Sequence, residues 1–182
     1  MLERLHWLGH GSFLIEGPPL IYINPWRVTR GTFHADAILI GHDHYEHFSP
    51  ADIEKLRGPD TVIATNEKVG AMVAGSTQLR TWHSLTLDRA RITAVPAYSV
   101  NDPRHALDEG GLGFVISLNF YDIYYAGDTG VIPEMQGLQP DIAILPIDGA
   151  NGTLSVEQAV EVVKQMRPRT VLPCNWGAGG EG

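Results

Sequence analysis

The chain has 182 residues, of which 43% are hydrophobic and 19% are charged, and its formal net charge at pH 7 is −8. These proportions are typical of an ordinary globular protein, and the length fits a single domain over residues 1–182. The negative charge disfavours binding to nucleic acid or to anionic membranes, because both require basic surfaces. The single cysteine, Cys174, excludes an intramolecular disulfide and a cysteine-rich zinc ribbon.

The sequence also carries no sign of a membrane or secretion segment. No stretch approaches the roughly 18 consecutive apolar residues of a membrane span, and the N-terminus lacks a basic segment followed by a long apolar run. A reducing compartment is the natural default for such a chain. We therefore expect a soluble, cytoplasmic protein without nucleic-acid or membrane partners, and a homo-oligomer is compatible with the sequence.

Short β-like runs separated by glycine and proline dominate the first half of the chain. The predicted strands there span residues 4–8, 12–16, 20–23, 37–40 and 61–64. Helical spacing and capping residues predict two helices in the same half, over residues 50–56, which Ser49 precedes, and over residues 66–73. We expect these helices to cover one face of a first sheet.

The second half repeats this style, with predicted strands over residues 92–95, 112–118, 122–126, 142–145 and 170–172. A helix is predicted from Ser155, which forms a capping-box pattern with Gln158, to a stop at Pro168. Its expected apolar stripe comprises Val156, Ala159, Val160, Val163 and Met166. The glycine-rich residues 177–182 are predicted to be a flexible tail with no helix to cover the site. Together these elements indicate an α/β protein with four layers, two mixed sheets inside outer helices.

A cluster of polar side chains lies between the predicted strand 37–40 and the predicted helix that begins after Ser49. Its six residues are His42, Asp43, His44, Tyr45, Glu46 and His47. On an extended backbone His42 and His44 point to the same side, and His47 lies one helical turn beyond His44. Imidazole and carboxylate together suit zinc and similar ions better than calcium or magnesium. The cluster therefore predicts a metal site, against the alternative of a histidine-rich surface turn.

Three other residues are candidates for the same site. Asp128 stands at a glycine turn after a predicted strand, where a purely structural Asp is an equal alternative. His105 lies in a long polar loop, in which a lone histidine is more often simply solvated. His10 is flanked by glycines that permit close backbone approach, so that it could line the site or cap a hairpin.

Taken together, these residues resemble the metallo-β-lactamase superfamily, in particular its small metal-dependent hydrolases related to ascorbate-6-phosphate lactonase. The signature His-x-His-x-Asp-His of that family is similar to residues 42–47. Further segments match in order and approximate spacing, namely 7–13, 21–26, 95–98, His105, 113–116, 126–129 and 172–173. The resemblance thus covers nearly the whole chain.

The resemblance implies an αβ/βα sandwich with a site at one edge between the two sheets. It implies a first metal held by His42, His44 and His105, with Asp128 bridging to a second. The second metal would use Glu46, His47 and a late histidine. A hydroxide between the ions would be the nucleophile.

Three positions depart from the family pattern. Glu46 stands where the family has Asp, and Asn24 replaces the usual Asp before a proline. Asn175, next to Cys174, stands where the family usually has its late histidine, and all eight histidines lie at or before position 105. Asp148 is a candidate to replace the missing histidine with a carboxylate, but an Asp before glycine more commonly has only a structural role in a turn.

We therefore expect a metal-dependent hydrolase acting on a small ester, lactone or phosphodiester-type substrate, with zinc as the favoured ion, one or two per chain, and manganese or iron as alternatives. Catalytic roles are expected for Glu46, as a base, and for Asp128 and His10. The expected metal sites are a well-occupied one at His42, His44, His105 and Asp128 and a weaker one at Glu46, His47 and Asp128. The alternative is a degenerate, non-catalytic metal- or ligand-binding module on the same scaffold. A nuclease would need an added domain and a basic surface, and the chain has neither.

Overall fold

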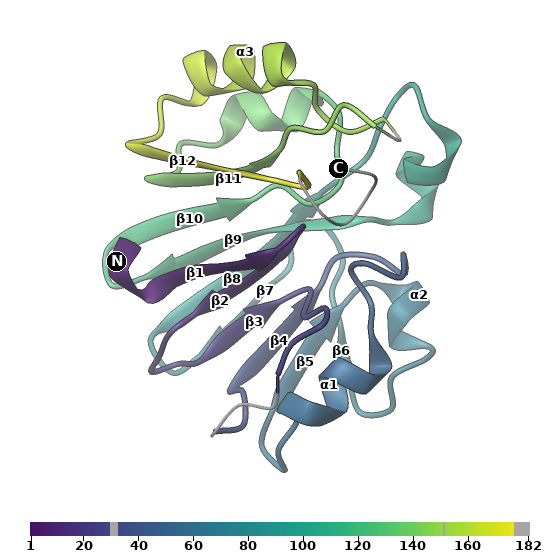
Figure 1. Ribbon diagram of the computed structural model, residues 1–182, viewed down its shortest axis with the longest axis vertical. Coiled ribbons are helices and arrows are strands. Elements are labelled where there is room, and N and C mark those ends of the chain that lie inside the picture. The colour runs from purple at the N-terminus through teal and green to yellow at the C-terminus, as the bar shows by residue number, and fades with distance from the viewer. Residues whose placement is uncertain (30–32, 151, 177–182) are drawn as a thin grey trace.

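A computed structural model describes residues 1–29, 33–150 and 152–176 of the chain. The predicted tail over residues 177–182 lies outside these described residues. Two mixed six-stranded sheets lie face to face, and the helices cover their outer faces (Figure 1). The predicted four-layer α/β sandwich is therefore confirmed.

The first sheet has the strand order β1-β2-β3-β4-β5-β6. Its strands are β1 (Leu5–Gly9), β2 (Ser12–Ile15), β3 (Ile21–Ile23), β4 (Ala37–Ile40), β5 (Val62–Thr65) and β6 (Thr77–Gln78). The first three strands pair antiparallel, and β3 to β6 pair parallel. Parallel pairing brings the carboxyl ends of β3, β4 and β5 to one edge of the sheet, and this edge carries the residues of the site.

The second sheet has the order β12-β11-β10-β9-β8-β7. Its strands are β7 (Ser84–Leu87), β8 (Ala90–Pro96), β9 (Leu112–Leu118), β10 (Tyr121–Tyr125), β11 (Ile142–Pro146) and β12 (Thr170–Cys174). Pairing is antiparallel from β7 to β10 and parallel from β10 to β12. The short strands β6 and β7 escaped prediction, because β6 is two polar residues long and β7 alternates polar and apolar residues, so that neither has a run of consecutive apolar residues.

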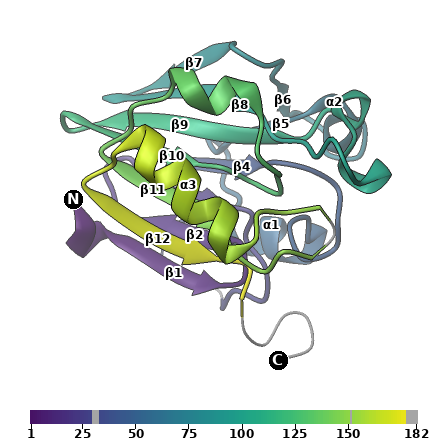
Figure 2. The same ribbon diagram turned by 90° about the horizontal axis from the view of Figure 1, so that it is seen from above.

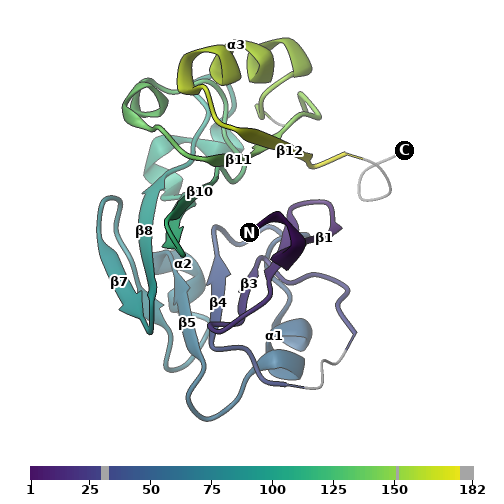
Figure 3. The same cartoon turned by 90° about the vertical axis from the view of Figure 1, so that its left-hand side faces the viewer.

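Within the described residues, three α-helices lie outside the sheets: α1 (Pro50–Leu56), α2 (Glu67–Gly70) and α3 (Val156–Met166). Helices α1 and α3 lie on opposite sides of the molecule, with both sheets between them (Figure 3), and α3 crosses the outer face of the second sheet (Figure 2). Four 3₁₀ helices complete the described elements: η1 (Leu2–Arg4), η2 (Pro103–His105), η3 (Leu107–Glu109) and η4 (Pro133–Gly137). No helix among the described residues is long and apolar enough to cross a membrane.

The caps expected from the sequence are present. Ser49 accepts a hydrogen bond from the Asp52 amide at the start of α1, and Ser155 forms a full capping box with Gln158. The second predicted helix is shorter than expected, because Asn66 caps a single turn that ends at Gly70. Capping residues are thus a better guide to where a helix begins than apolar spacing is to where it ends.

The apolar stripe expected on α3 was partly wrong. Val156 and Val160 are exposed, whereas Ala159, Val162 and Met166 are buried against the second sheet. Valines occur on more than one side of this helix, so that the apolar residues of the sequence are compatible with two different buried faces. Packing against the second sheet determines which of the two faces is buried. The main core lies between the sheets and includes Phe13, Ile15, Leu39, Phe114, Ile116 and Tyr125.

Candidate metal centre

The histidine cluster follows β4, and Gly41, directly before it, brings the backbone close to the second sheet. The Gly41 carbonyl accepts a hydrogen bond of 3.0 Å from the Leu112 amide at the start of β9. A Cβ atom on Gly41 would lie 2.5 Å from the Leu112 carbonyl oxygen, so that only glycine permits this approach. The chain then turns tightly, with the amides of His47 and Phe48 bonded to the His44 carbonyl. This turn directs His42, His44 and His47 inward.

The second sheet contributes two further candidates from loops at the same edge. His105 ends the 3₁₀ helix η2, and its carbonyl accepts a 2.7 Å hydrogen bond from the Ser99 amide. Asp128 follows β10 after Gly127, whose φ of 69° lies in the left-handed region that glycine tolerates. Thr129 fixes this turn by donating to the Tyr98 carbonyl at 2.9 Å.

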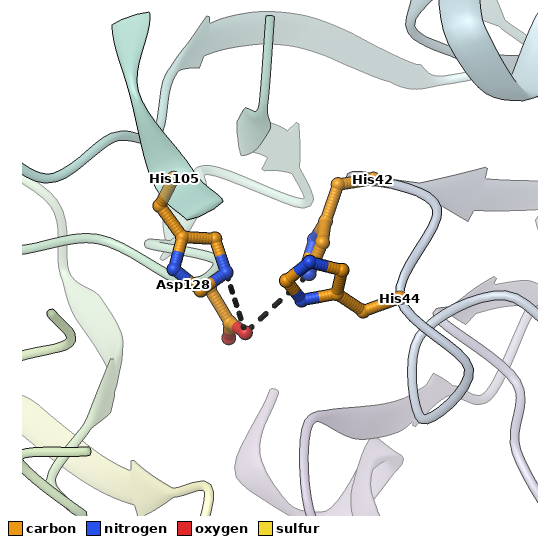
Figure 4. A group of neighbouring side chains, drawn as sticks. All are labelled: His42, His44, His105 and Asp128. Atoms are coloured by element: carbon orange, nitrogen blue, oxygen red, sulfur yellow. Dashed lines mark ion pairs between the residues drawn. The ribbon is translucent and has the colours of Figure 1, made fainter. Parts of the chain in front are cut away.

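Four of the predicted ligands converge on one point (Figure 4). One ligand atom from each of His42, His44, His105 and Asp128 lies within 4.8 Å of all the others. Oδ2 of Asp128 is 3.4 Å from Nε2 of His42 and 3.5 Å from Nε2 of His105. Figure 4 shows the first two histidines approaching from one side and His105 with Asp128 from the other. This set is the first cluster.

The spacing of the first cluster fits a zinc-sized ion. Charge-assisted hydrogen bonds between nitrogen and oxygen are about 2.7–2.9 Å long, and the two measured separations are longer. Ligand atoms about 2.0 Å from a tetrahedral zinc ion lie about 3.3 Å apart, which is close to the measured values. Nε2 of His42 is buried without a hydrogen-bond partner among the described residues. The donor set therefore fits a metal ion better than a hydrogen-bonded network.

The ionisation states also suit a metal. Burial and the neighbouring His47 lower the pKa of His42 to about 4, so that the ring is neutral at pH 7 and able to bind a cation. Burial alone would raise the pKa of Asp128, but the imidazoles of His47 and His42 outweigh it and hold that pKa well below its usual value. Asp128 is therefore a carboxylate.

A second cluster adjoins the first and comprises His10, Glu46 and His47, again with ligand atoms within 4.8 Å of one another. His47 is fully buried, and its Nε2 lies 3.2 Å from Oδ2 of Asp128. The structure therefore brings His10 into the group in which the sequence predicted Glu46, His47 and Asp128. Burial, followed by the neighbouring His47, lowers the pKa of His10.

Asn175 takes the place at this second cluster where the resemblance implies a histidine. Its side-chain amide donates a 2.6 Å hydrogen bond to Oδ1 of Asp128. The two alternatives considered for that position lie elsewhere. Cys174 is buried in the core between the sheets, where burial raises its thiol pKa, and Asp148 accepts a hydrogen bond from Thr153. Neither belongs to a metal-sized cluster of the described residues.

Tyr125 and Gly11 lie behind the second cluster, and the sequence alone had assigned neither of them a role. The Tyr125 hydroxyl is buried between Asn24 and Gly11, bonded to both at 2.8 and 2.9 Å. A Cβ atom on Gly11 would lie 2.6 Å from Cε1 of His47, which explains a glycine there. The consecutive tyrosines of β10 were the available signal, because adjacent strand residues face opposite sides and one of them had to point into the sandwich.

Comparison with known proteins assigns the family. The family profile described as a beta-lactamase superfamily domain matches residues 4–175. The chain belongs to the beta-lactamase superfamily. The resemblance seen in the sequence is confirmed at that level, whereas the likeness to ascorbate-6-phosphate lactonase stays a prediction.

Relatives in this superfamily agree in name and in structure. A metal-dependent hydrolase of Methanosphaera stadtmanae is 33% identical over 202 residues, covering 95% of this chain and 83% of its own. A metal-dependent hydrolase of Pyrococcus abyssi is 30% identical over 193 residues, covering 96% of this chain and 85% of its own. A crystal structure from Parabacteroides distasonis is named as a candidate metal-dependent hydrolase and matches with a TM-score of 0.87 at 29% identity. The match covers 97% of this chain and 83% of the crystallised chain. The expectation of an enzyme of the metal-dependent hydrolase class is thereby confirmed.

Proposed function

We propose that the protein is a hydrolase that depends on one firmly held metal ion, with His42, His44, His105 and Asp128 as ligands. The convergence of these four buried or half-buried side chains within 4.8 Å carries the proposal. Three imidazoles and one carboxylate match zinc best, and manganese or iron are the alternatives for the same donors. The second cluster is proposed to bind a second ion weakly or not at all, because Asn175 offers a neutral amide in place of an imidazole.

A divalent ion in the first cluster would supply an acidified water and a Lewis acid for the substrate oxygen. The chain supplies the proton acceptor. Oε2 of Glu46 is buried and has no hydrogen-bond partner among the described residues, and it lies beside the ligand atoms of His10 and His47. A free carboxylate oxygen in that position can take the proton of an attacking water. His10, whose lowered pKa keeps it neutral, can orient the substrate by a hydrogen bond.

A surface groove beside His10 supports a small substrate. It has a volume of about 220 Å³ and is lined by Trp7, Leu8, Gly9, His10, Trp26, Arg27 and Trp176. Trp7 stacks on Trp176 with ring centroids 4.9 Å apart, and the Arg27 guanidinium lies 4.2 Å from the Trp26 ring centroid. Flat apolar walls with one cation suit an ester, lactone or phosphodiester that carries an apolar group and a negative charge.

The test begins with the metal content of the protein as isolated. We expect close to one ion per chain, by mass spectrometry of the metal and by anomalous scattering from crystals. Hydrolysis of lactone, phosphodiester and β-lactam reporters is then measured with added zinc or manganese. His42→Ala should abolish both metal retention and turnover, while His83→Ala, at an exposed histidine outside both clusters, should change neither.

Two outcomes would contradict the proposal. Two ions per chain in the isolated protein would show that the second cluster is not weak. One ion per chain with no turnover on any reporter would favour the metal-binding module instead, since loss of one ligand commonly removes an activity while the scaffold persists.

A further inference from the structure

Asn24 organises the buried polar groups behind the second cluster. It follows β3, is fully buried, and has a φ of 44°, which Asn adopts more readily than most residues. Its Oδ1 accepts a 2.9 Å hydrogen bond from the Gly41 amide. Its Nδ2 lies 2.9 Å from Nδ1 of His47 and 2.8 Å from the Tyr125 hydroxyl. All the hydrogen-bonding groups of this amide except one oxygen lone pair are therefore occupied.

The orientation of the Asn24 amide follows from its neighbours. The Gly41 amide can only donate, so that the side-chain oxygen must face it and the NH₂ group must face His47. The Tyr125 hydroxyl gives its own proton to the Gly11 carbonyl at 2.9 Å and accepts from Asn24 with a lone pair. Rotating the amide by half a turn would set two N–H donors against each other at Gly41 and leave a buried backbone group unpaired.

This orientation decides where His47 carries its proton. Burial opposes a charge on His47, but Asp128 outweighs burial and raises the pKa of this histidine, which favours a proton on the nitrogen that faces the carboxylate, Nε2. Because Nδ2 of Asn24 donates, Nδ1 of His47 must accept, and the neutral ring above that pKa then holds its single proton on Nε2. A metal ligand needs a free lone pair on that nitrogen. We propose that Asn24 holds His47 as an N–H donor facing Asp128, so that His47 is not a metal ligand and the second cluster does not hold an ion.

Asn175 completes the arrangement from the other side of Asp128. Its amide donates to Oδ1 at 2.6 Å, while Nε2 of His47 lies 3.2 Å from Oδ2. On the side of the second cluster, Oδ1 of Asp128 therefore accepts a hydrogen bond, whereas Oδ2 faces Nε2 of His47 at an ion-pair separation and not in a hydrogen bond. Both groups stabilise the negative charge of Asp128 where a second cation would otherwise do so, and Oδ2 also faces the first cluster. Asn24 is thus a positioning residue that acts through His47.

The inference rests on the proposed function only in assigning the first cluster to the catalytic ion. Its test needs no turnover, because the protonated nitrogen of His47 is seen directly in long-range ¹H–¹⁵N spectra of protein labelled at histidine. We expect Nε2–H and an unprotonated Nδ1 in the metal-free protein, and the same after one equivalent of zinc. The resonance is assigned by its loss in His47→Gln.

The matched variant is Asn24→Asp. A carboxylate accepts from both the Gly41 amide and Nδ1–H of His47, so that the tautomer should reverse and Nε2 should become free. The affinity for a second zinc should then rise by about 10- to 100-fold, the usual effect of an outer partner of a metal-binding histidine. Asn119→Asp is the control, because Asn119 also has a positive φ, of 53°, and lies in the turn between β9 and β10, outside both clusters.

The outcomes separate this inference from the proposed function. Nδ1–H at His47 in the unchanged protein overturns the inference, whether or not Asn24→Asp folds. Loss of the Nε2 proton when a second equivalent of zinc binds tightly overturns it as well. Failure of zinc to bind the first cluster would instead overturn the proposed function, and the tautomer of the metal-free protein would still decide the role of Asn24.

Discussion

Nδ2 of Asn175 donates a 2.6 Å hydrogen bond to Oδ1 of Asp128, and both side chains are at least nine-tenths buried. Replacing Asn175 by His removes this donor and adds an imidazole. We expect the affinity for a second zinc, measured by isothermal titration, to rise by at least the roughly 10-fold that an outer partner alone contributes.

The gain from Asn175→His should depend on Asn24. While Asn24 donates to His47, only one of the two imidazoles can bind, and therefore Asn24→Asp combined with Asn175→His should gain more than the two single variants together. A double-mutant cycle on zinc affinity measures this coupling. Strictly additive gains would contradict the arrangement of N–H donors around Asp128.

Glu46→Gln separates a base from a ligand. If Glu46 accepts the proton of the attacking water, the neutral amide should reduce kcat by about 10²- to 10⁴-fold and leave one metal ion per chain in place. Steady-state kinetics and metal analysis of the same preparation check this. Glu54→Gln, on the exposed side of α1, should keep both values. A fall in metal content with Glu46→Gln would instead make Glu46 a ligand of the resident ion.

The metal-free protein should lose stability in mild acid. The pKa of His42 falls from 6.5 to about 4 on folding, because the ring is buried beside His47. Between these values the unfolded chain binds a proton that the folded protein does not, and so the free energy of unfolding decreases as the pH falls through this window. The contribution is at most about 3 kcal/mol, since one pKa unit corresponds to about 1.4 kcal/mol.

Urea unfolding in the presence of a chelator, at several pH values between about 7 and 4, measures this dependence. His42→Gln should flatten the slope, while His83→Gln should keep it. Parallel slopes for the unchanged protein and His42→Gln would mean that the ring is already charged in the folded state.

Only one of the adjacent tyrosines of β10 should lose stability when its hydroxyl is removed. The Tyr124 hydroxyl is buried without a hydrogen-bond partner among the described residues, so that Tyr124→Phe should leave the free energy of unfolding unchanged or raise it by about 1 kcal/mol. Tyr125→Phe should lower it by about 1–3 kcal/mol, because Asn24 loses an acceptor and Gly11 a donor. Denaturant titration of both variants gives the comparison, and the reverse order would be incompatible with the buried network.

The first cluster could be predicted from the sequence because its chemistry is concentrated in short segments. His42 and His44 follow a run of four buried apolar residues, and Asp128 follows a strand that ends in glycine. Strand ends at one edge of a sandwich meet in space, so that order along the chain was enough to place these side chains together. His105 was weaker as a prediction, since nothing local distinguishes it from a solvated loop histidine.

The second cluster could not be predicted in the same way, because it depends on pairings across the sandwich. From the sequence, Asn24 was notable only because it replaces a charged Asp of the family pattern. Its hydrogen bonds to His47 and Tyr125 join positions that are 23 and 101 residues apart in the chain, and no local pattern predicts them. Similarly, His10 meets Glu46 through the approach of two turns that no local pattern specifies. The strands β6 and β7 were missed for the related reason that pairing with neighbours, not apolar content, makes them strands.

The first cluster draws two ligands from the end of the first sheet, His42 and His44, and two from loops of the second, His105 and Asp128. An ion held there ties together segments more than 60 residues apart in the chain. It should therefore protect this edge of the sandwich against local opening, to a degree set by the free metal concentration relative to the dissociation constant. Resistance to proteases, and with it the lifetime of the protein in a cell, would then follow the supply of metal.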